Sequence, residues 1–174
     1  MTGETLPLID GLDLLAKEID APPWIIPNVL PAGGCTIVAG QPKAGKSWAT
    51  LDMALAIASG GEFLGHQVVE PGRVLYLDAE TPEWALQERL RHLAAGRCLD
   101  ADALKRLRIM PAAWLDLSQQ PDFDRLFTTI LRDPPDLIVI DPLVRFHTLD
   151  ENSASEMSPW LQALRSLPSP RTSV

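Results

Sequence analysis

The chain has 174 residues, of which 46% are hydrophobic and 22% charged, and its mean hydropathy is +0.04. This balance is typical of one globular domain with a sizeable core, and it excludes intrinsic disorder and collagen-like sequence. Fifteen Lys and Arg residues against 23 Asp and Glu residues give a net charge of −8, which excludes a basic protein that coats nucleic acid.

The N-terminal sequence and the cysteines bear on the cellular compartment. The first ten residues carry acids where a signal peptide needs positive charge, and no apolar run approaches the ~20 residues that span a bilayer. We therefore expect a cytoplasmic protein without membrane contact. Two cysteines, Cys35 and Cys98, are too few for a disulfide scaffold or a zinc cluster, and we expect both to be buried thiols.

Residues 1–33 are predicted to form a short N-terminal helix followed by an extended lead-in. Leu8, Leu12, Leu15 and Ile19 recur at helical spacing, which indicates an amphipathic helix. The prolines that follow bias their predecessors away from helix, so the lead-in should be extended.

From residue 34 to residue 174 the pattern alternates between strands and helices. We predict apolar strands at residues 35–40, 73–80, 106–112 and 137–141 and a hairpin at 63–72. Helices are predicted at 47–59, from Pro82 with Leu86, Leu90 and Leu93 on one face, at 122–132 and after Ser153. Continuous apolar strands between helices argue for a parallel sheet covered on both sides, and hence for an α/β fold in which residues 137–141 are buried on both faces.

Capping residues mark the ends of these helices. Gly60 should end the helix at 47–59. Thr81 can cap the next helix, with Pro82 at its first position. Ser153 and Glu156 have the spacing of a capping box, which predicts reciprocal side-chain hydrogen bonds at the start of the last helix.

A phosphate-binding loop lies between the first predicted strand and its helix. Its sequence fits G-x-x-x-x-G-K-[ST] at every fixed position, and its candidate phosphate-binding residues are Gly40, Gln41, Pro42, Lys43, Ala44, Gly45, Lys46, Ser47 and the adjacent Trp48. The glycines allow the backbone N–H groups to point at phosphate oxygens. Lys46 is placed to reach the β- and γ-phosphates of ATP, and Ser47 to ligate Mg²⁺. Lys43 is expected to be a solvated loop charge, and Trp48 can instead be a packing residue.

Two carboxylates follow the predicted strands. Asp141 ends four apolar residues, which is the Walker B pattern, and at the carboxyl end of a parallel strand it would lie beside the phosphates and hold Mg²⁺. The alternative is a strand-end acid that faces solvent. Glu80 ends the strand at 73–80 and is a candidate catalytic base for water. It can instead compensate the dipole of the following helix, and Asp78 is an alternative base.

These residues resemble a known family. The lead-in W-I-I-P-N-V-L-P-A-G-G, the phosphate loop, the strand Y-L-D-A-E and the segment I-D-P-L-V-R-F-H-T-L-D-E-N are similar to RecA-like ATPase domains of RepA-type hexameric helicases, over residues 6–167. The resemblance implies a RecA-like P-loop fold, ATP bound at the interface of a homo-oligomeric ring, and a motor subunit of plasmid, phage or mobile-element DNA replication. It assigns catalytic roles to Lys46 and Glu80, and Mg²⁺ ligation to Ser47 and Asp141.

The segment after Asp141 allows two interpretations. By resemblance, Arg145 and His147 lie near the nucleotide or the ring channel, where they would sense phosphate or contact single-stranded DNA. Alternatively, the segment shapes a turn before the last helix. His66, in the predicted hairpin, and His92, on a helix surface, are not expected to have a role in chemistry.

After Leu167 the sequence leaves the family pattern, because two prolines replace a continuing helix and no strand pattern follows. We therefore expect an ATPase core truncated at its C-terminus, without the strand that separates the phosphate-loop strand from the Walker B strand. Those two strands would then pair directly, receive a strand from a partner, or fold poorly. The function hypotheses are an Mg²⁺-dependent ATPase and, alternatively, an inactive nucleotide-binding fragment or regulatory subunit. A small-molecule kinase fits less well, since no arginine-rich lid is evident.

Overall fold

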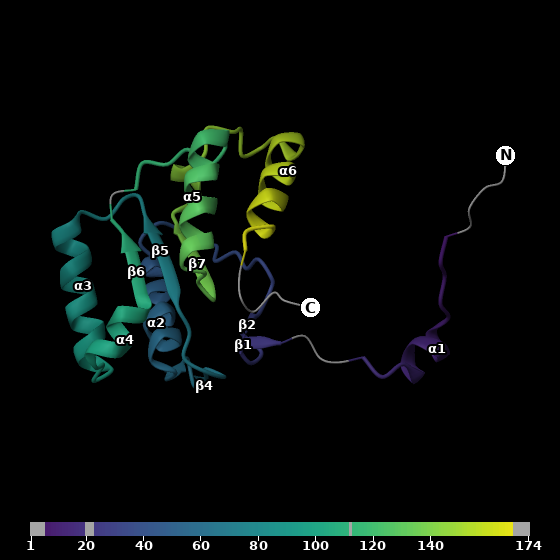
Figure 1. Cartoon of the computed structure of the whole chain (residues 1–174), viewed down its shortest axis with the longest axis horizontal. Coiled ribbons are helices and arrows are strands. Elements are labelled where there is room, and N and C mark those ends of the chain that lie inside the picture. The colour runs from purple at the N-terminus through teal and green to yellow at the C-terminus, as the bar shows by residue number, and fades with distance from the viewer. Residues whose placement is uncertain (1–5, 20–22, 112, 169–174) are drawn as a thin grey trace.

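The computed structural model describes residues 6–19, 23–111 and 113–168. Its centre is a three-stranded parallel sheet in the order β6–β5–β7 (Figure 1). These strands are β5 (Val74–Asp78), β6 (Leu107–Met110) and β7 (Leu137–Asp141). Asp78 and Asp141 are register partners at the carboxyl ends of β5 and β7. The predicted α/β class with a parallel sheet is therefore confirmed.

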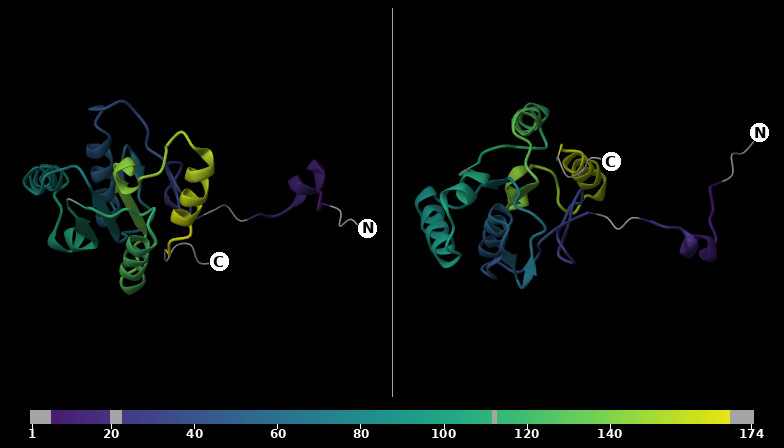
Figure 2. Two further views of the ribbon diagram at one scale, coloured as in Figure 1. Left: turned by 90° about the horizontal axis from the view of Figure 1, so that it is seen from above. Right: turned by 60° about the horizontal axis from the view of Figure 1, so that its bottom comes forward.

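Helices cover both faces of the sheet (Figure 2). One face carries α2 (Lys46–Ser59), with α3 (Glu83–Gly96) and α4 (Ala101–Arg106) beside it. The other face carries α5 (Gln120–Arg132) and α6 (Ala154–Arg165). Alternate residues of β5 serve the two cores, with Tyr76 buried on the α2 side and Leu77 buried on the α5 and α6 side. Because successive side chains of a strand point to opposite faces of the sheet, β5 contributes to both hydrophobic cores.

Shorter elements complete the fold. They are the hairpin β1 (Trp24–Ile26) and β2 (Leu30–Pro31), the hairpin β3 (Glu62–Phe63) and β4 (His66–Gln67), and the 3₁₀ helix η1 (Leu143–Phe146). The hairpin at 63–72 was expected, whereas the lead-in pairs with itself and α4 lies where no helix was predicted. The helix α2 ends where expected, with Gly60 in the left-handed region at φ 74°.

The N-terminal helix α1 (Gly11–Ala16) confirms a helix in the first segment, and Asp10 caps it. This helix stands away from the body of the molecule (Figure 1), and it contains no buried residue. Its apolar positions Leu12 and Leu15 are exposed. Within the described part of the chain, no helix has the length and apolar character needed to cross a bilayer.

The strand predicted at residues 35–40 does not form. This segment has no regular secondary structure, and Ile37 and Val38 are 65% and 50% exposed. Among the described residues, β7 has no strand on the edge away from β5, and residues 35–40 do not pair with that edge. Direct pairing of the phosphate-loop strand with the Walker B strand, one of the expected outcomes, is therefore wrong.

The expectation that residues 137–141 are buried on both faces is also wrong. In β7 only Val139 is buried, and its neighbours along the strand are partly exposed. The cause is position rather than composition, because β7 is an edge strand of the described sheet whereas β5 is central.

Two predictions of helix caps fail for identifiable reasons. The helix α3 begins at Glu83 with Pro82 at its N-cap, because the Thr81 hydroxyl accepts a hydrogen bond from Arg89 (3.2 Å) rather than capping the helix. Ser153 is the N-cap residue of α6 but makes no side-chain cap, and Glu156 accepts from the backbone N–H of Asp150 (3.2 Å).

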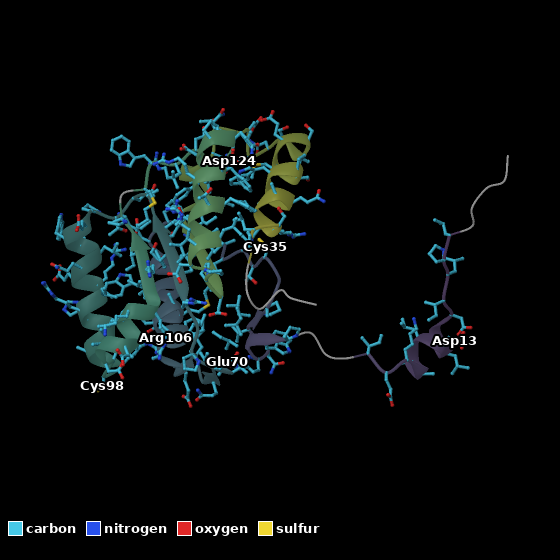
Figure 3. The ribbon with its side chains drawn as sticks, viewed as in Figure 1. Asp13, Cys35, Glu70, Cys98, Arg106 and Asp124 are labelled. Atoms are coloured by element: carbon cyan, nitrogen blue, oxygen red, sulfur yellow. The ribbon has the colours of Figure 1, made fainter. Side chains whose placement is uncertain are left out.

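The cysteines also differ from expectation. Cys35 and Cys98 are free thiols, and both are exposed rather than buried. Figure 3 shows them in separate parts of the molecule, Cys98 beyond the end of α3 and Cys35 in the segment that precedes the phosphate loop. Each lies outside regular structure, which explains why an apolar sequence neighbourhood did not bury it.

Candidate functional site

The predicted phosphate loop leads directly into α2. Gly45 is the N-cap residue at φ 86°, and Lys43 also has a positive φ of 64°. No side chain caps this end of α2, so the N–H groups of its first turn remain available to an anion. The ammonium group of Lys46 donates to the carbonyl oxygens of Gly40 (2.8 Å) and Gln41 (2.9 Å). The loop therefore curls around its own lysine, whose charge lies at the end of the helix where an anion binds best.

A hydrogen-bonded path joins α2 to the carboxyl end of β7. The hydroxyl groups of Thr50, in the first turns of α2, and Tyr76, on β5, are 2.9 Å apart. The Tyr76 hydroxyl donates to Oδ2 of Asp141 (2.7 Å). Burial raises the pKa of Tyr76 far above its usual value, and the neighbouring Asp141 carboxylate raises it further, so the hydroxyl keeps its proton. The structure thus places the Walker B acid against the helix that begins in the phosphate loop.

Asp78 organises the turn that carries Glu80. Its side chain is 2% exposed, and Oδ1 accepts from the backbone N–H groups of Glu80 (3.0 Å) and Thr81 (2.7 Å). A carboxylate that accepts two backbone hydrogen bonds in the core holds the chain direction just after β5. Asp78 is therefore engaged in shaping this turn, whereas Glu80 reaches solvent.

Glu80 and Arg145 meet at the rim of an open cleft. The Arg145 Nε lies 2.8 Å from Glu80 Oε1, and the two side chains are 64% and 52% exposed. The cleft has a volume of about 540 Å³ and is lined by these two residues with Ala79, Ala113 and Trp114. An ion pair this exposed contributes only ~0–1 kcal/mol, so a ligand can open it at little cost.

A second connection runs from the phosphate loop to the Glu80 turn. The Arg89 guanidinium lies over the ring of Trp48, 5.6 Å from its centroid, and also donates to the hydroxyl of Thr81 (3.2 Å). Trp48 is 41% exposed, so it is not a core residue, and its ring provides the face on which Arg89 of α3 lies. Arg89 therefore contacts both Trp48, next to the phosphate loop, and Thr81, in the turn that carries Glu80.

Arg145 lies within η1 and His147 directly follows it, and the two side chains have different surroundings. Arg145 faces Glu80 in the cleft, whereas His147 is 8% exposed and packs its ring against Trp160, with centroids 4.5 Å apart. The indole N–H of Trp160 donates to the carbonyl of Leu117 (3.0 Å). The structure therefore brings Arg145, but not His147, to the solvent-accessible side of Glu80. His66 lies in the β3–β4 hairpin and His92 on the exposed surface of α3, as predicted.

Ser47 and Asp141 carry oxygen groups of the kind that bind Mg²⁺. Within the described ranges, no group of three or more His, Cys, Asp or Glu residues could hold a metal. Mg²⁺ uses one or two protein ligands together with phosphate oxygens and water, which the Ser47 hydroxyl and the Asp141 carboxylate can supply. Oδ2 of Asp141 accepts from Tyr76, and the described residues make no hydrogen bond to Oδ1.

The fold and the site together define the class of protein. A phosphate loop that opens a helix, packed on a parallel sheet with an acid at a strand end, defines a P-loop nucleotide-binding protein with a RecA-like α/β fold. A family model described as an AAA domain (AAA_25) matches residues 4–172. The chain therefore belongs to this AAA domain family of P-loop ATPases.

Two residues of the site were not identified from the sequence. Tyr76 was treated as part of an apolar strand, although a hydroxyl inside a buried strand needs a hydrogen-bond partner and so signals a polar neighbour. Arg89 gave no such signal, because an arginine on a polar helix face is ordinary and only the packing of α3 on α2 gives it Trp48 as a neighbour.

Proposed function

We propose that the chain binds ATP with Mg²⁺ at the loop of residues 40–47 and hydrolyses it. The observation that carries this proposal is the path from Thr50 through Tyr76 to Asp141, which sets the metal-side acid against the first turns of the phosphate-loop helix. Membership of an ATPase family supports it.

In this proposal each group has a separate task. Lys46 leaves its two loop carbonyls to bind phosphate oxygens, and the N–H groups of the first turn of α2 bind the rest of the anion. Ser47 and Asp141 would hold Mg²⁺, which when bound would supply positive charge to the phosphates. Glu80 orients or deprotonates the attacking water once Arg145 no longer pairs with it.

Binding tests the first half of the proposal. A fluorescent ATP analogue should bind saturably, and Lys46→Ala should weaken binding by roughly 10- to 100-fold, since a charge-assisted hydrogen bond contributes ~1.5–3 kcal/mol. Lys105→Ala is the control, because it removes an exposed lysine on α4, outside the loop, and should change affinity little. Equal losses in both variants would indicate a general charge effect and would contradict a phosphate site built on Lys46.

Turnover tests the second half. Glu80→Gln should reduce phosphate release by ~10²–10⁴-fold while the affinity for the ATP analogue is unchanged. Glu83→Gln, three residues later in the first turn of α3, is a control of equal charge change. Unchanged turnover in Glu80→Gln would remove this residue from the mechanism.

The resemblance to RepA-type helicases extends the proposal to a ring-forming motor of DNA replication. On that view the subunits assemble as a homo-oligomer, a basic residue from a neighbour completes each site, and single-stranded DNA is the partner. Specific activity should then rise with protein concentration, and sedimentation with ATP should detect the oligomer. Activity per subunit that is independent of concentration would contradict the ring.

A second candidate is a nucleotide-binding protein that does not hydrolyse ATP. Two observations favour it, the ion pair that occupies Glu80 and the position of residues 35–40 outside the sheet. It predicts saturable binding with no phosphate release at any protein concentration. Addition to an intact relative would then change the ATPase rate of that relative only if mixed assemblies form.

A further inference from the structure

The hydroxyl of Tyr76 lies at the meeting point of three elements. Tyr76 comes from the central strand β5 and is 1% exposed. Its oxygen lies 2.7 Å from Asp141 Oδ2 on β7 and 2.9 Å from Thr50 Oγ1 on α2. The Thr50 hydroxyl also lies 3.3 Å from the backbone carbonyl oxygen of Ser47. The Tyr76 hydroxyl therefore joins Asp141, one candidate metal ligand, to Thr50, which lies three residues after the other candidate, Ser47.

The chemistry of the three groups fixes the direction of these bonds. An ionised carboxylate has no proton and can only accept, so the proton between Tyr76 and Asp141 belongs to the tyrosine. The tyrosine oxygen can then accept from Thr50. The carboxylate of Asp141 thus has one oxygen restrained by a group that is itself locked in the core.

We propose that Tyr76 is a positioning residue for Mg²⁺, whose hydroxyl holds the Asp141 carboxylate in a fixed orientation against the helix that carries Ser47. The inference rests on the proposed function, since it assumes that Asp141 and Ser47 serve the metal of a bound nucleotide. Groups that hydrogen-bond to a metal ligand fix its orientation, and their removal commonly lowers metal affinity without touching the metal.

Tyr76→Phe tests this role, because it keeps the ring in the core and removes only the hydroxyl. The Mg²⁺ concentration needed for half-maximal enhancement of ATP-analogue binding should rise about tenfold, whereas binding of the analogue in EDTA should be unchanged. Thr50→Val removes the other end of the path and should give a smaller rise. Thr129→Val, which removes an exposed hydroxyl bonded only to the Arg125 carbonyl in α5, is the matched control and should change neither quantity.

A second measurement does not depend on a variant. Tyr76 is the single tyrosine of the chain, so 3-fluorotyrosine incorporation gives one fluorine resonance that reports on this hydroxyl alone. Addition of Mg²⁺ to the complex with ADP should shift that resonance, and addition of Mn²⁺ should broaden it. A resonance that neither ion changes would overturn the inference.

The outcomes separate this inference from the proposed function. If Tyr76→Phe weakens analogue binding equally with Mg²⁺ and with EDTA, Tyr76 has a structural role only and the inference is wrong, while the ATP site stands. If the wild-type chain binds no ATP analogue under any condition, the proposed function fails first and the inference falls with it.

Discussion

Two segments of this molecule are both predicted to be apolar strands, and they have opposite structures. Residues 35–40 read C-T-I-V-A-G and precede the phosphate loop, whereas β5 reads V-L-Y-L-D and precedes the turn with Glu80. In β5 four of the five residues are buried, and the strand pairs with β6 on one side and β7 on the other. Residues 35–40 are exposed throughout and form no ladder.

The difference shows that an apolar run becomes a strand only where neighbouring strands accept its backbone hydrogen bonds. Both segments have the residue types that favour strands, but β propensity measures fit to a pleated, partly buried surface rather than a preference of the isolated chain. The phosphate loop is consequently followed by the packed helix α2 and preceded by a segment that pairs with no strand among the described residues. Each of the following experiments probes this contrast.

Hydrogen exchange should give the largest difference. Amides in β5 should exchange on the order of a thousandfold or more slowly than those of residues 36–39, because only the β5 amides require cooperative opening of the sheet. Mass spectrometry of peptides that cover each segment measures both rates in one sample. Comparable protection of the two segments would mean that residues 35–40 are paired in solution.

The second-largest difference is expected in the free energy of unfolding when one side chain in each segment is truncated. Leu77→Ala removes a side chain that is 1% exposed in β5 and should lower the free energy of unfolding by ~2–5 kcal/mol. Ile37→Ala removes one that is 65% exposed and should change the same quantity by no more than about 0.5 kcal/mol. Urea denaturation of both variants measures the difference, and a large loss in Ile37→Ala would contradict the exposed position.

A smaller effect is expected where a side chain ties α2 to its surroundings. Arg97, at the end of α3, contacts Asp52 of α2 through Nε (2.5 Å) and Nη2 (2.7 Å) and donates to the Glu62 carbonyl (2.8 Å). Arg97→Ala should therefore cost about 1–3 kcal/mol of stability, since a partly buried carboxylate loses its partner. Lys105→Ala, which removes the exposed pair with Asp102, is the control and should cost less than about 0.5 kcal/mol. Equal losses in the two variants would contradict a stabilising role of the Arg97–Asp52 pair.

The smallest effect on stability is expected at Asp116. Unlike residues 35–40, the coil segment around Asp116 is held by side-chain hydrogen bonds. Burial acts to raise the pKa of Asp116, but hydrogen bonds from the hydroxyl and N–H of Ser118 and from the hydroxyl of Thr148 outweigh it and lower the pKa below its usual value. The ionised form therefore stabilises the folded state above a pH of about 4, the usual range of the unfolded carboxyl, and this contribution is lost as the pH falls through the lower folded pKa.

Asp116→Asn should accordingly lower the free energy of unfolding by about 0.5–1 kcal/mol at neutral pH, with the difference from wild type shrinking as the pH falls below about 4. Denaturation at a series of pH values measures this difference. Asp124→Asn, on the exposed face of α5, is the control variant. A difference that persists unchanged at acidic pH would contradict an ionised Asp116 as its source.

The sequence by itself determined the fold class, the alternation of strands and helices, and the phosphate loop. These follow from local rules, because hydrophobic period, glycine placement and the spacing G-x-x-x-x-G-K-S are properties of contiguous residues. The helix α2 was predicted within one residue of its start, and its end at Gly60 was predicted as observed. Asp141 was predicted at the end of an apolar strand and ends β7, whereas β5 ends at Asp78, two residues before the predicted strand end at Glu80.

Only the tertiary structure decided which apolar runs are strands and which site residues meet. The exposure of residues 35–40, the edge position of β7 and the burial of His147 depend on neighbours far along the chain, to which a local pattern is blind. The same holds for the contacts of Tyr76 with Asp141 and of Arg145 with Glu80, each of which joins residues 65 positions apart. Hydrogen-bond partners and burial are determined by the packing of the whole chain. They distinguish a strand from an apolar loop, and they distinguish an acid held by hydrogen bonds from one without a partner.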